Sequence, residues 1–161
     1  MNFLEKVRRN HGIEHATVHV MSESDPNLSV IGRADGDGFA IIGDVNPEML
    51  ANAAQEALRR MQRGQGDLAV HPRCGTMLVT MGAMTALAAF LALGRRPKLS
   101  RLPDAILATT LAAFLAQPAG LALQKHITTS PDAQNARFVG VARKHFAGID
   151  FWHVDIAWDG A

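Results

Sequence analysis

The sequence contains a single cysteine, Cys74, and has no excess of charge of either sign. One cysteine excludes an internal disulfide bond and suits a reducing compartment, where the thiol is buried, reactive or bound to a metal. Sixteen Lys and Arg residues against fifteen Asp and Glu give a formal net charge of +1, which provides no general attraction to nucleic acid. Aromatic residues make up only 6% of the chain, so nucleic-acid binding is disfavoured further.

Several motifs of well-known enzyme classes are absent as well. The sequence has no Gly-rich phosphate loop, nucleophile elbow or CxxC pair, which disfavours nucleotide binding and Rossmann-type chemistry. The N-terminal sequence MNFLEKVRRNHG lacks an apolar core and a small-residue cleavage site, so we expect no signal peptide. A length of 161 residues allows one domain with its own core, or a small domain plus a membrane hairpin.

Residues 1–75 are predicted to form an α+β region that contains the metal site described below. The Asp-Gly pairs within residues 34–38 favour a tight β-hairpin. Asn46 followed by Pro47 is typical of a helix N-cap and first helical position. The expected elements are a helix over residues 1–20, strands at Leu28–Arg33 and Phe39–Ile42, a helix from Pro47 to about Arg63, and a short strand at Asp67–His71.

Two apolar runs, Thr76–Gly94 and Ala105–Leu123, each contain nineteen residues without a charge. Because this length spans a bilayer as helix, we predict a transmembrane helical hairpin over residues 76–124. A tight basic connection separates the runs and comprises Arg95, Arg96, Pro97, Lys98 and Arg101. The alternative is a pair of buried helices in a soluble protein, although so short a chain has little protein with which to cover both helices on every side.

Residues 125–161 return to a β pattern. Strands are expected at Phe138–Arg143 and Ile149–Trp158, where apolar residues alternate with His153 and Asp155. We expect these strands to complete the N-terminal sheet. The predicted fold is therefore α+β, a small N-terminal helix, β-hairpin and helix completed by C-terminal strands, with a two-helix transmembrane hairpin inserted.

The segment His11-Gly12-Ile13-Glu14-His15 carries the most specific chemical signal. In a helix, His11 and His15 project from the same side one turn apart, which lets two imidazoles hold one cation. Glu14 completes the string H-x-x-E-H, the inverted form of the zincin motif, in which the carboxylate acts as general base. The alternative is a solvated polar helix face without a metal.

Two histidines are too few for a zinc site, which needs at least three protein ligands. The best further source is His71 with Cys74, an H-x-x-C on a turn constrained by proline and glycine. His19 lies about 80° round the helix from His11 and is expected to flank the site. Taken singly, Cys74 is more often a buried apolar residue, and His71-Pro72 is more often an ordinary turn.

Two segments resemble the signature segments of a known family. Residues 10–17, NHGIEHAT, and residues 71–76, HPRCGT, are similar to those of the YqhQ-like proteins, uncharacterised bacterial membrane proteins regarded as metal-dependent enzymes. The chain also resembles a smaller uncharacterised bacterial family that shares these segments together with residues 116–118 and 128–129. The resemblance implies that a metal is held by His11, His15, His71 and Cys74, with Glu14 as ligand or base.

Two functional hypotheses follow. In the first, a divalent metal, expected to be zinc, serves a hydrolase that uses metal-activated water, with Glu14 moving the proton. In the second, a His, His, His, Cys set closes the tetrahedron around a structural zinc, and the protein is a non-enzymatic scaffold or interaction protein.

We expect the chain to lie in the bacterial inner membrane, in contact with lipid and able to form homo-oligomers. The basic loop favours outward termini under the positive-inside rule. The missing signal peptide and the thiolate ligand favour cytoplasmic termini, and we adopt that orientation.

Overall fold

A computed structural model describes residues 1–95 and 98–159 of the chain, which divides into two compact units. The sheet unit comprises Met1–His71 and Lys125–Ala161, and the helical hairpin unit comprises Pro72–Gln124. Arg96 and Pro97 of the predicted basic connection lie outside the described residues. Each unit is described by itself.

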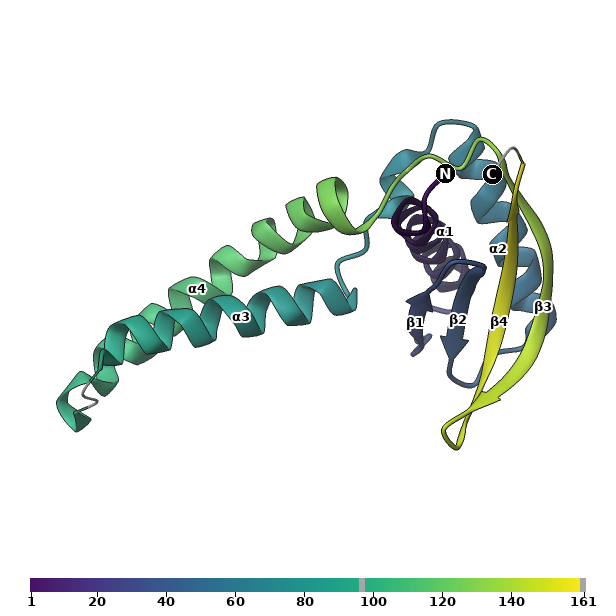
Figure 1. The fold of residues 1–161 in the computed structure, drawn as a ribbon. Coiled ribbons are helices and arrows are strands. Elements are labelled where there is room, and N and C mark those ends of the chain that lie inside the picture. The colour runs from purple at the N-terminus through teal and green to yellow at the C-terminus, as the bar shows by residue number, and fades with distance from the viewer. Residues whose placement is uncertain (96–97, 160–161) are drawn as a thin grey trace. The chain divides into compact units, whose positions relative to one another are not determined.

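The sheet unit combines two helices with a four-stranded antiparallel sheet of order β1-β2-β4-β3 (Figure 1). Its C-terminal strands complete the N-terminal hairpin because β4 pairs with β2, with Val154 opposite Phe39. The α+β fold predicted from the sequence is therefore confirmed. The elements are α1 (Phe3–Ser24), β1 (Ile31–Ala34), β2 (Gly38–Ile42), α2 (Pro47–Gln62), β3 (Ala136–Phe146) and β4 (Ile149–Trp158).

Local sequence explains where these elements begin and turn. The side chain of Asn2 accepts a hydrogen bond from the N–H of Glu5 at 2.8 Å and so caps α1. Asn46 caps α2 in the same way, and Pro47 follows at the first helical position, as predicted. The β3–β4 turn contains Ala147 and Gly148 with φ values of 51° and 81°, which suit a tight hairpin.

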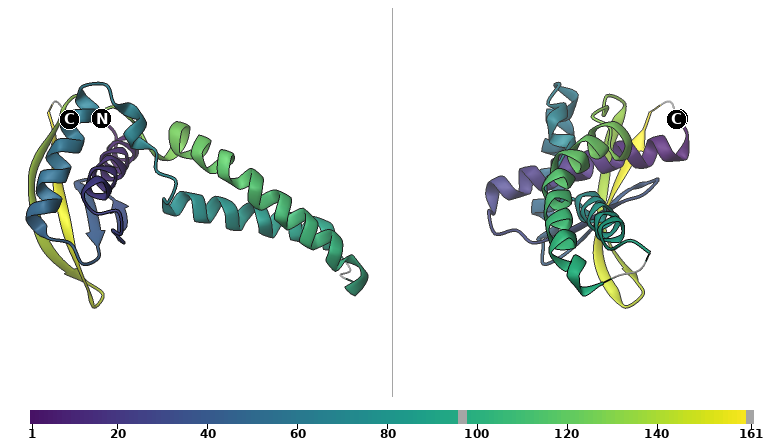
Figure 2. Two further views of the ribbon diagram at one scale, coloured as in Figure 1. Left: turned by 180° about the vertical axis from the view of Figure 1, so that it is seen from behind. Right: turned by 90° about the vertical axis from the view of Figure 1, so that its left-hand side faces the viewer.

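The core of this unit lies between α1, α2 and one face of the sheet. The alternating pattern of β4 places Val154 at 0% exposure and Ile156 at 5%. The apolar sides of both helices pack against this face, which Figures 1 and 2 show from several directions. The central buried residues are Ile13, Ala16, Met21, Phe39, Ile41, Leu50, Ala54, Ala57, Met61, Val154 and Ile156.

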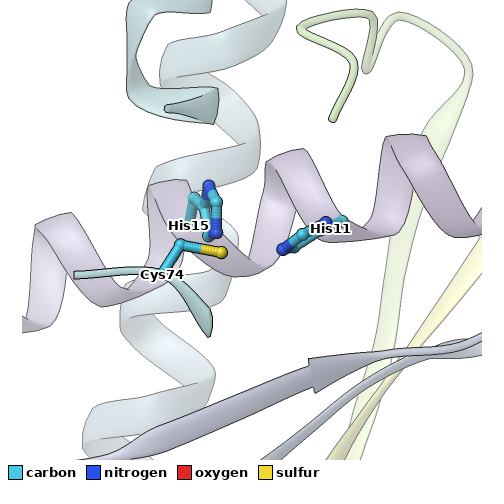
Figure 3. A group of neighbouring side chains, drawn as sticks. All are labelled: His11, His15 and Cys74. Atoms are coloured by element: carbon cyan, nitrogen blue, oxygen red, sulfur yellow. The ribbon is translucent and has the colours of Figure 1, made fainter. Parts of the chain in front are cut away.

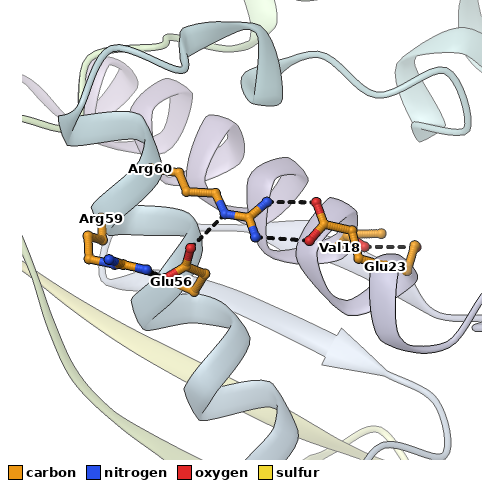
Figure 4. A network of polar contacts seen from close by, with 6 residues as sticks. Val18, Glu23, Glu56, Arg59 and Arg60 are labelled. Atoms are coloured by element: carbon orange, nitrogen blue, oxygen red, sulfur yellow. Dashed lines mark hydrogen bonds and ion pairs between the residues drawn. The ribbon is translucent and has the colours of Figure 1, made fainter.

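An ionic network at the surface fastens α1 to α2. The guanidinium of Arg60 donates to both carboxylate oxygens of Glu23, at 2.6 and 2.9 Å, and to Glu56 at 2.7 Å (Figure 4). The hydrogen bond from Arg60 is the main reason why the pKa of Glu23 lies below its usual value. Because the network joins two helices that share a core, it fixes their relative rotation.

The predicted strand at Asp67–His71 is wrong. Gly66–Ala69 form a short 3-10 helix, closed by a hydrogen bond from the N–H of Val70 to the carbonyl of Asp67 at 3.2 Å. The carbonyls of Ala69 and Val70 accept hydrogen bonds from imidazoles of α1 instead of from a neighbouring strand. The segment therefore lies along α1, and this position matters for the candidate site.

The helical hairpin unit consists of α3 (Gly75–Leu93) and α4 (Leu102–Leu123), which lie side by side in both Figures 1 and 2. Small residues allow close packing: a Cβ at Gly120 would overlap the sulfur of Met77. Threonine hydroxyls are satisfied within their own helix, as in the bond from Thr80 to the carbonyl of Thr76 at 2.7 Å. The second helix continues through Gln117 and Pro118.

Both helices of this unit are long and apolar enough to cross a membrane. Their most apolar windows have mean hydropathies of 1.9 and 1.7, and only 6% and 11% of these windows are buried within the chain. A core helix of a soluble protein is mostly buried, so this low burial is more typical of helices that cross a membrane than of a buried soluble pair. Large apolar side chains such as Val79 and Phe114 instead point outward, at 74% and 72% exposure.

Candidate metal centre

The central part of α1 is buried and unusually polar for a core helix. Glu14 and His15 are 5% and 2% exposed, although charged or ionisable side chains are rarely buried without a partner. Gly12 makes this burial possible because a Cβ there would collide with the carbonyl of Ser130 and touch Ala69. Two chain segments from far along the sequence thus lie directly against the HGIEH turn of α1.

His15 is held in one tautomer by the backbone. Its Nδ1 lies 2.8 Å from the carbonyl oxygen of Ala69, and because a carbonyl only accepts, Nδ1 carries the proton and donates. Nε2 is then the lone-pair nitrogen. It is buried and has no hydrogen-bond partner among the residues that the structure describes. A buried, oriented lone pair of this kind is what a metal ion requires of a histidine ligand.

His11 is oriented in the same way one turn earlier. Its Nδ1–H donates to the carbonyl of Thr128 at 2.9 Å, and its ring centroid lies 4.4 Å from that of His15. Figure 3 shows both imidazoles on the same side of α1, as the four-residue spacing predicted. Both histidines therefore have an Nδ1–H that is bound to a backbone carbonyl.

Glu14 lies beside this histidine pair. One of its carboxylate oxygens is 4.0 Å from Nε2 of His11. The carboxylate packs onto Gly32 of β1, where a Cβ would overlap it. Sequence reasoning missed Gly32, although a glycine inside a predicted strand is itself a signal of close approach by another group. A carboxylate at this position is placed to accept a proton or to bind a cation.

His71 reaches the same side of α1 from the end of the 3-10 segment. Its ring centroid is 5.9 Å from that of His15 and 4.6 Å from that of His19. His19 uses its other nitrogen, because Nε2–H donates to the carbonyl of Val70 at 3.0 Å. Within the sheet unit, the structure thus brings together four imidazoles, and His71 lies nearer to His19 than to His15.

Cys74 begins the helical hairpin unit, three residues after His71. Its Sγ caps α3 by accepting a hydrogen bond from the N–H of Thr76 at 3.4 Å. The Sγ atom of Cys74 therefore lies at the N-terminus of α3. His11, His15 and Cys74 each offer one ligand atom that suits zinc.

The remaining histidines lie outside this cluster of imidazoles. His153 is 3% exposed, with Nδ1 at 2.7 Å from Asp155 and Nε2 at 3.0 Å from Asp35. It therefore joins the β1–β2 loop to β4. His126 is exposed, and His145 lies at the surface beside Asp150.

The family to which the chain belongs can now be stated. The model of a domain of unknown function (DUF6391) matches residues 6–141, and the chain belongs to this family. An uncharacterised protein of Picosynechococcus sp. (strain ATCC 27264 / PCC 7002 / PR-6) is 33% identical over 135 residues, which cover 77% of this chain and 66% of that relative. No solved structure matches the chain. Membership of an uncharacterised family is thereby confirmed.

Proposed function

We propose that this chain is a membrane protein that binds zinc or a similar divalent metal through α1. The observation that carries the proposal is the buried Nε2 of His15, whose companion Nδ1–H is fixed by the carbonyl of Ala69. A buried nitrogen lone pair without a partner costs stability, on the order of 1–3 kcal/mol, and a bound metal would remove that cost. The donor set fits zinc because imidazole and thiolate are its preferred ligands.

The ligands we propose are His11 and His15 through Nε2, with a third from the segment His71–Cys74. Support comes from the ring of His71, whose centroid lies 5.9 Å from that of His15. A hydrogen bond from the second ring nitrogen to a backbone carbonyl is the usual support of a metal-bound histidine, and His11 and His15 both have it.

The reaction we propose is hydrolysis. A zinc ion at this position would supply a Lewis acid that lowers the pKa of a coordinated water. Glu14 would accept the proton of that water and return it to the leaving group, since its carboxylate lies beside His11 and is shielded from solvent.

The alternative is a structural zinc in a non-enzymatic scaffold or interaction protein. Cys74 favours it, because a thiolate added to three imidazoles completes a tetrahedron and leaves no position for water. Such a metal would tie α1 to the chain that enters α3, and its loss would loosen the sheet unit.

We further propose that the two apolar helices place the protein in the bacterial plasma membrane with cytoplasmic termini. Their exposed leucines and phenylalanines would contact lipid. Two helices cover little of each other's surface, so a homo-oligomer is a natural way to shield the polar amide of Gln117.

The decisive experiment measures metal content and activity together. The full chain is purified under reducing conditions, its metal content is determined by elemental analysis, and hydrolysis is assayed with chromogenic esters, phosphoesters and peptides. For a hydrolase, Glu14→Gln retains the metal and loses activity, whereas Glu48→Gln, an exposed control on α2, changes neither. For a structural zinc, Glu14→Gln is mild and Cys74→Ser releases the metal. A wild-type chain without stoichiometric metal would show that both versions are wrong.

A further inference from the structure

His19 and His71 form a second pair of imidazoles, more exposed to solvent than His15, and the proposed function does not use them as a pair. His19 and His71 have ring centroids 4.6 Å apart at an interplanar angle of 66°. Both side chains are partly exposed, in contrast to His15 at 2%. Both belong to the sheet unit, so their separation is a property of that unit alone.

The backbone fixes which nitrogen each α1 histidine presents. The consecutive carbonyls of Ala69 and Val70 accept hydrogen bonds from His15 and His19, which are one helical turn apart. His15 donates through Nδ1 and keeps Nε2 as its lone pair, whereas His19 donates through Nε2 and keeps Nδ1. The lone pair is therefore on Nε2 in His15 and on Nδ1 in His19.

The geometry points to a second metal position, bound by His19 through Nδ1 and by His71, and separate from the centre at His11 and His15. Two imidazoles suit the borderline divalent ions, such as zinc, cobalt, nickel or copper. The hydrogen bond to Val70 gives His19 the backbone support that histidine ligands usually have.

The outer position is the weaker and more accessible one. It has two protein ligands, fewer than the three or four of a catalytic or structural zinc site, so it would hold an ion only weakly, with water in the remaining coordination positions. Glu23, one turn beyond His19 on α1, is not available as a third ligand because both of its oxygens hold Arg60 at 2.6 and 2.9 Å. Partial exposure of both rings allows metal to enter and leave from solvent. We therefore expect one tightly held and one readily exchanged ion per chain.

Counting bound metal tests the proposal. The full-length chain in detergent, stripped with chelator and kept reduced, is dialysed against zinc, and the bound zinc per chain is measured before and after desalting. The wild-type chain is expected to hold two ions at saturation and one after desalting. His19→Gln keeps a donor for the carbonyl of Val70 but lacks an imidazole, and it should hold one ion in both measurements. His126→Gln, an exposed histidine, is the matched control and should retain two.

Different results would contradict the inner and the outer metal position. His11→Ala should remove the tightly held ion and leave the exchangeable one, and an unchanged count in this variant would contradict the inner centre alone. A single ion in the wild-type chain at saturation, or two in His19→Gln, would overturn the outer position. If His19→Gln does not fold, selective ¹⁵N labelling of histidine in the wild-type chain decides the matter. The Nδ1 resonance of His19 must then shift as the second equivalent of zinc is added, and an unmoved resonance refutes the proposal.

Discussion

The Nδ1–H of His15 donates to the carbonyl oxygen of Ala69 at 2.8 Å, across 54 residues of sequence. This bond ties the middle of α1 to the segment that leads into α3, and it decides which ring nitrogen faces the candidate centre. The same bond makes His15 part of the fold as well as part of the site. Metal binding and stability of the sheet unit should therefore be linked.

Zinc should stabilise the wild-type chain through this linkage. A ligand present at about 100 times its Kd stabilises the folded state by about 2.7 kcal/mol, provided that it does not bind the unfolded chain. The measurement is thermal unfolding of chelator-treated protein with and without added zinc. His15→Ala should lose most of the zinc-dependent rise in Tm, which comes from the tightly held ion, while His126→Ala, an exposed control, should retain it. An equal rise in all three proteins would place the stabilising ion elsewhere.

Gly32→Ala tests the packing of Glu14 on β1. The added Cβ would overlap the carboxylate of Glu14, so the side chain or the strand must move, at a cost of about 1–3 kcal/mol in the free energy of unfolding. Gly140→Ala on β3 is the matched control, because a Cβ there meets no atom within 4 Å among the described residues. The measurement is urea unfolding of both variants.

A double variant distinguishes this clash with Glu14 from a loss of stability that any replacement of Gly32 would cause. Glu14→Ala removes the carboxylate that the new Cβ would meet. In that background Gly32→Ala should cost much less than it does in the wild-type chain. A loss that is the same in both backgrounds would show that Glu14 does not occupy the space above Gly32.

The parts of the fold that local chemistry specifies could be predicted from the sequence. The cap at Asn46, the Asp-Gly hairpin and the alternation of β4 each rest on neighbours within a few residues, and each was confirmed. The strand predicted at Asp67–His71 failed because its environment is a distant helix, whose imidazoles take the carbonyls that a strand would use.

In the candidate site, too, features set by nearby residues could be predicted, whereas features set by distant segments could not. The spacing of His11 and His15 placed both on one side of α1, as Figure 3 shows, because helical periodicity is a local property. The tautomers were beyond prediction because they depend on carbonyls at residues 69, 70 and 128. The proximity of His19 to His71 was missed for the same reason, since the angle round α1 predicted only that His19 flanks the site.

A labelling experiment can determine the orientation of the helical hairpin unit in the membrane. In a Cys74→Ser background, a cysteine replacing Ser100 lies between the two helices, in the short loop beside Arg101. Cytoplasmic termini require that a membrane-impermeant thiol reagent labels this cysteine from outside intact cells. A cysteine at Asp132 should then be labelled only after lysis. Labelling of Asp132→Cys, but not of Ser100→Cys, in intact cells would reverse the proposed orientation and agree with the positive-inside rule.

The hydrogen bonds that join buried His153 to Asp35 and Asp155 predict how the stability of the fold responds to acid. Burial acts to raise the pKa of Asp35, but the hydrogen bonds from the N–H of Asp37 and from His153 outweigh it and hold the pKa below its usual value of 3.8. A carboxyl group with a lowered pKa contributes stability above its unfolded pKa, and that contribution is lost as the pH falls through the folded value. The loss should therefore occur below about pH 4.

Asp35→Asn tests this contribution, because its amide has one oxygen that can accept from the N–H of Asp37 and an uncharged NH2 group in place of the oxygen that faces Nε2 of His153. The amide therefore resembles the protonated carboxyl group. With metal removed by chelator, the variant should be less stable than wild type at pH 6 by about 0.5–1 kcal/mol, a modest value because the side chain of Asp35 is 48% exposed. The two proteins should converge as the pH falls from 5 to 2, since Asp35 is then protonated in wild type. Asp44→Asn, an exposed control, should show no such convergence. A gap between Asp35→Asn and wild type that persists at pH 2 would mean that the charge of Asp35 does not hold the β1–β2 loop against β4.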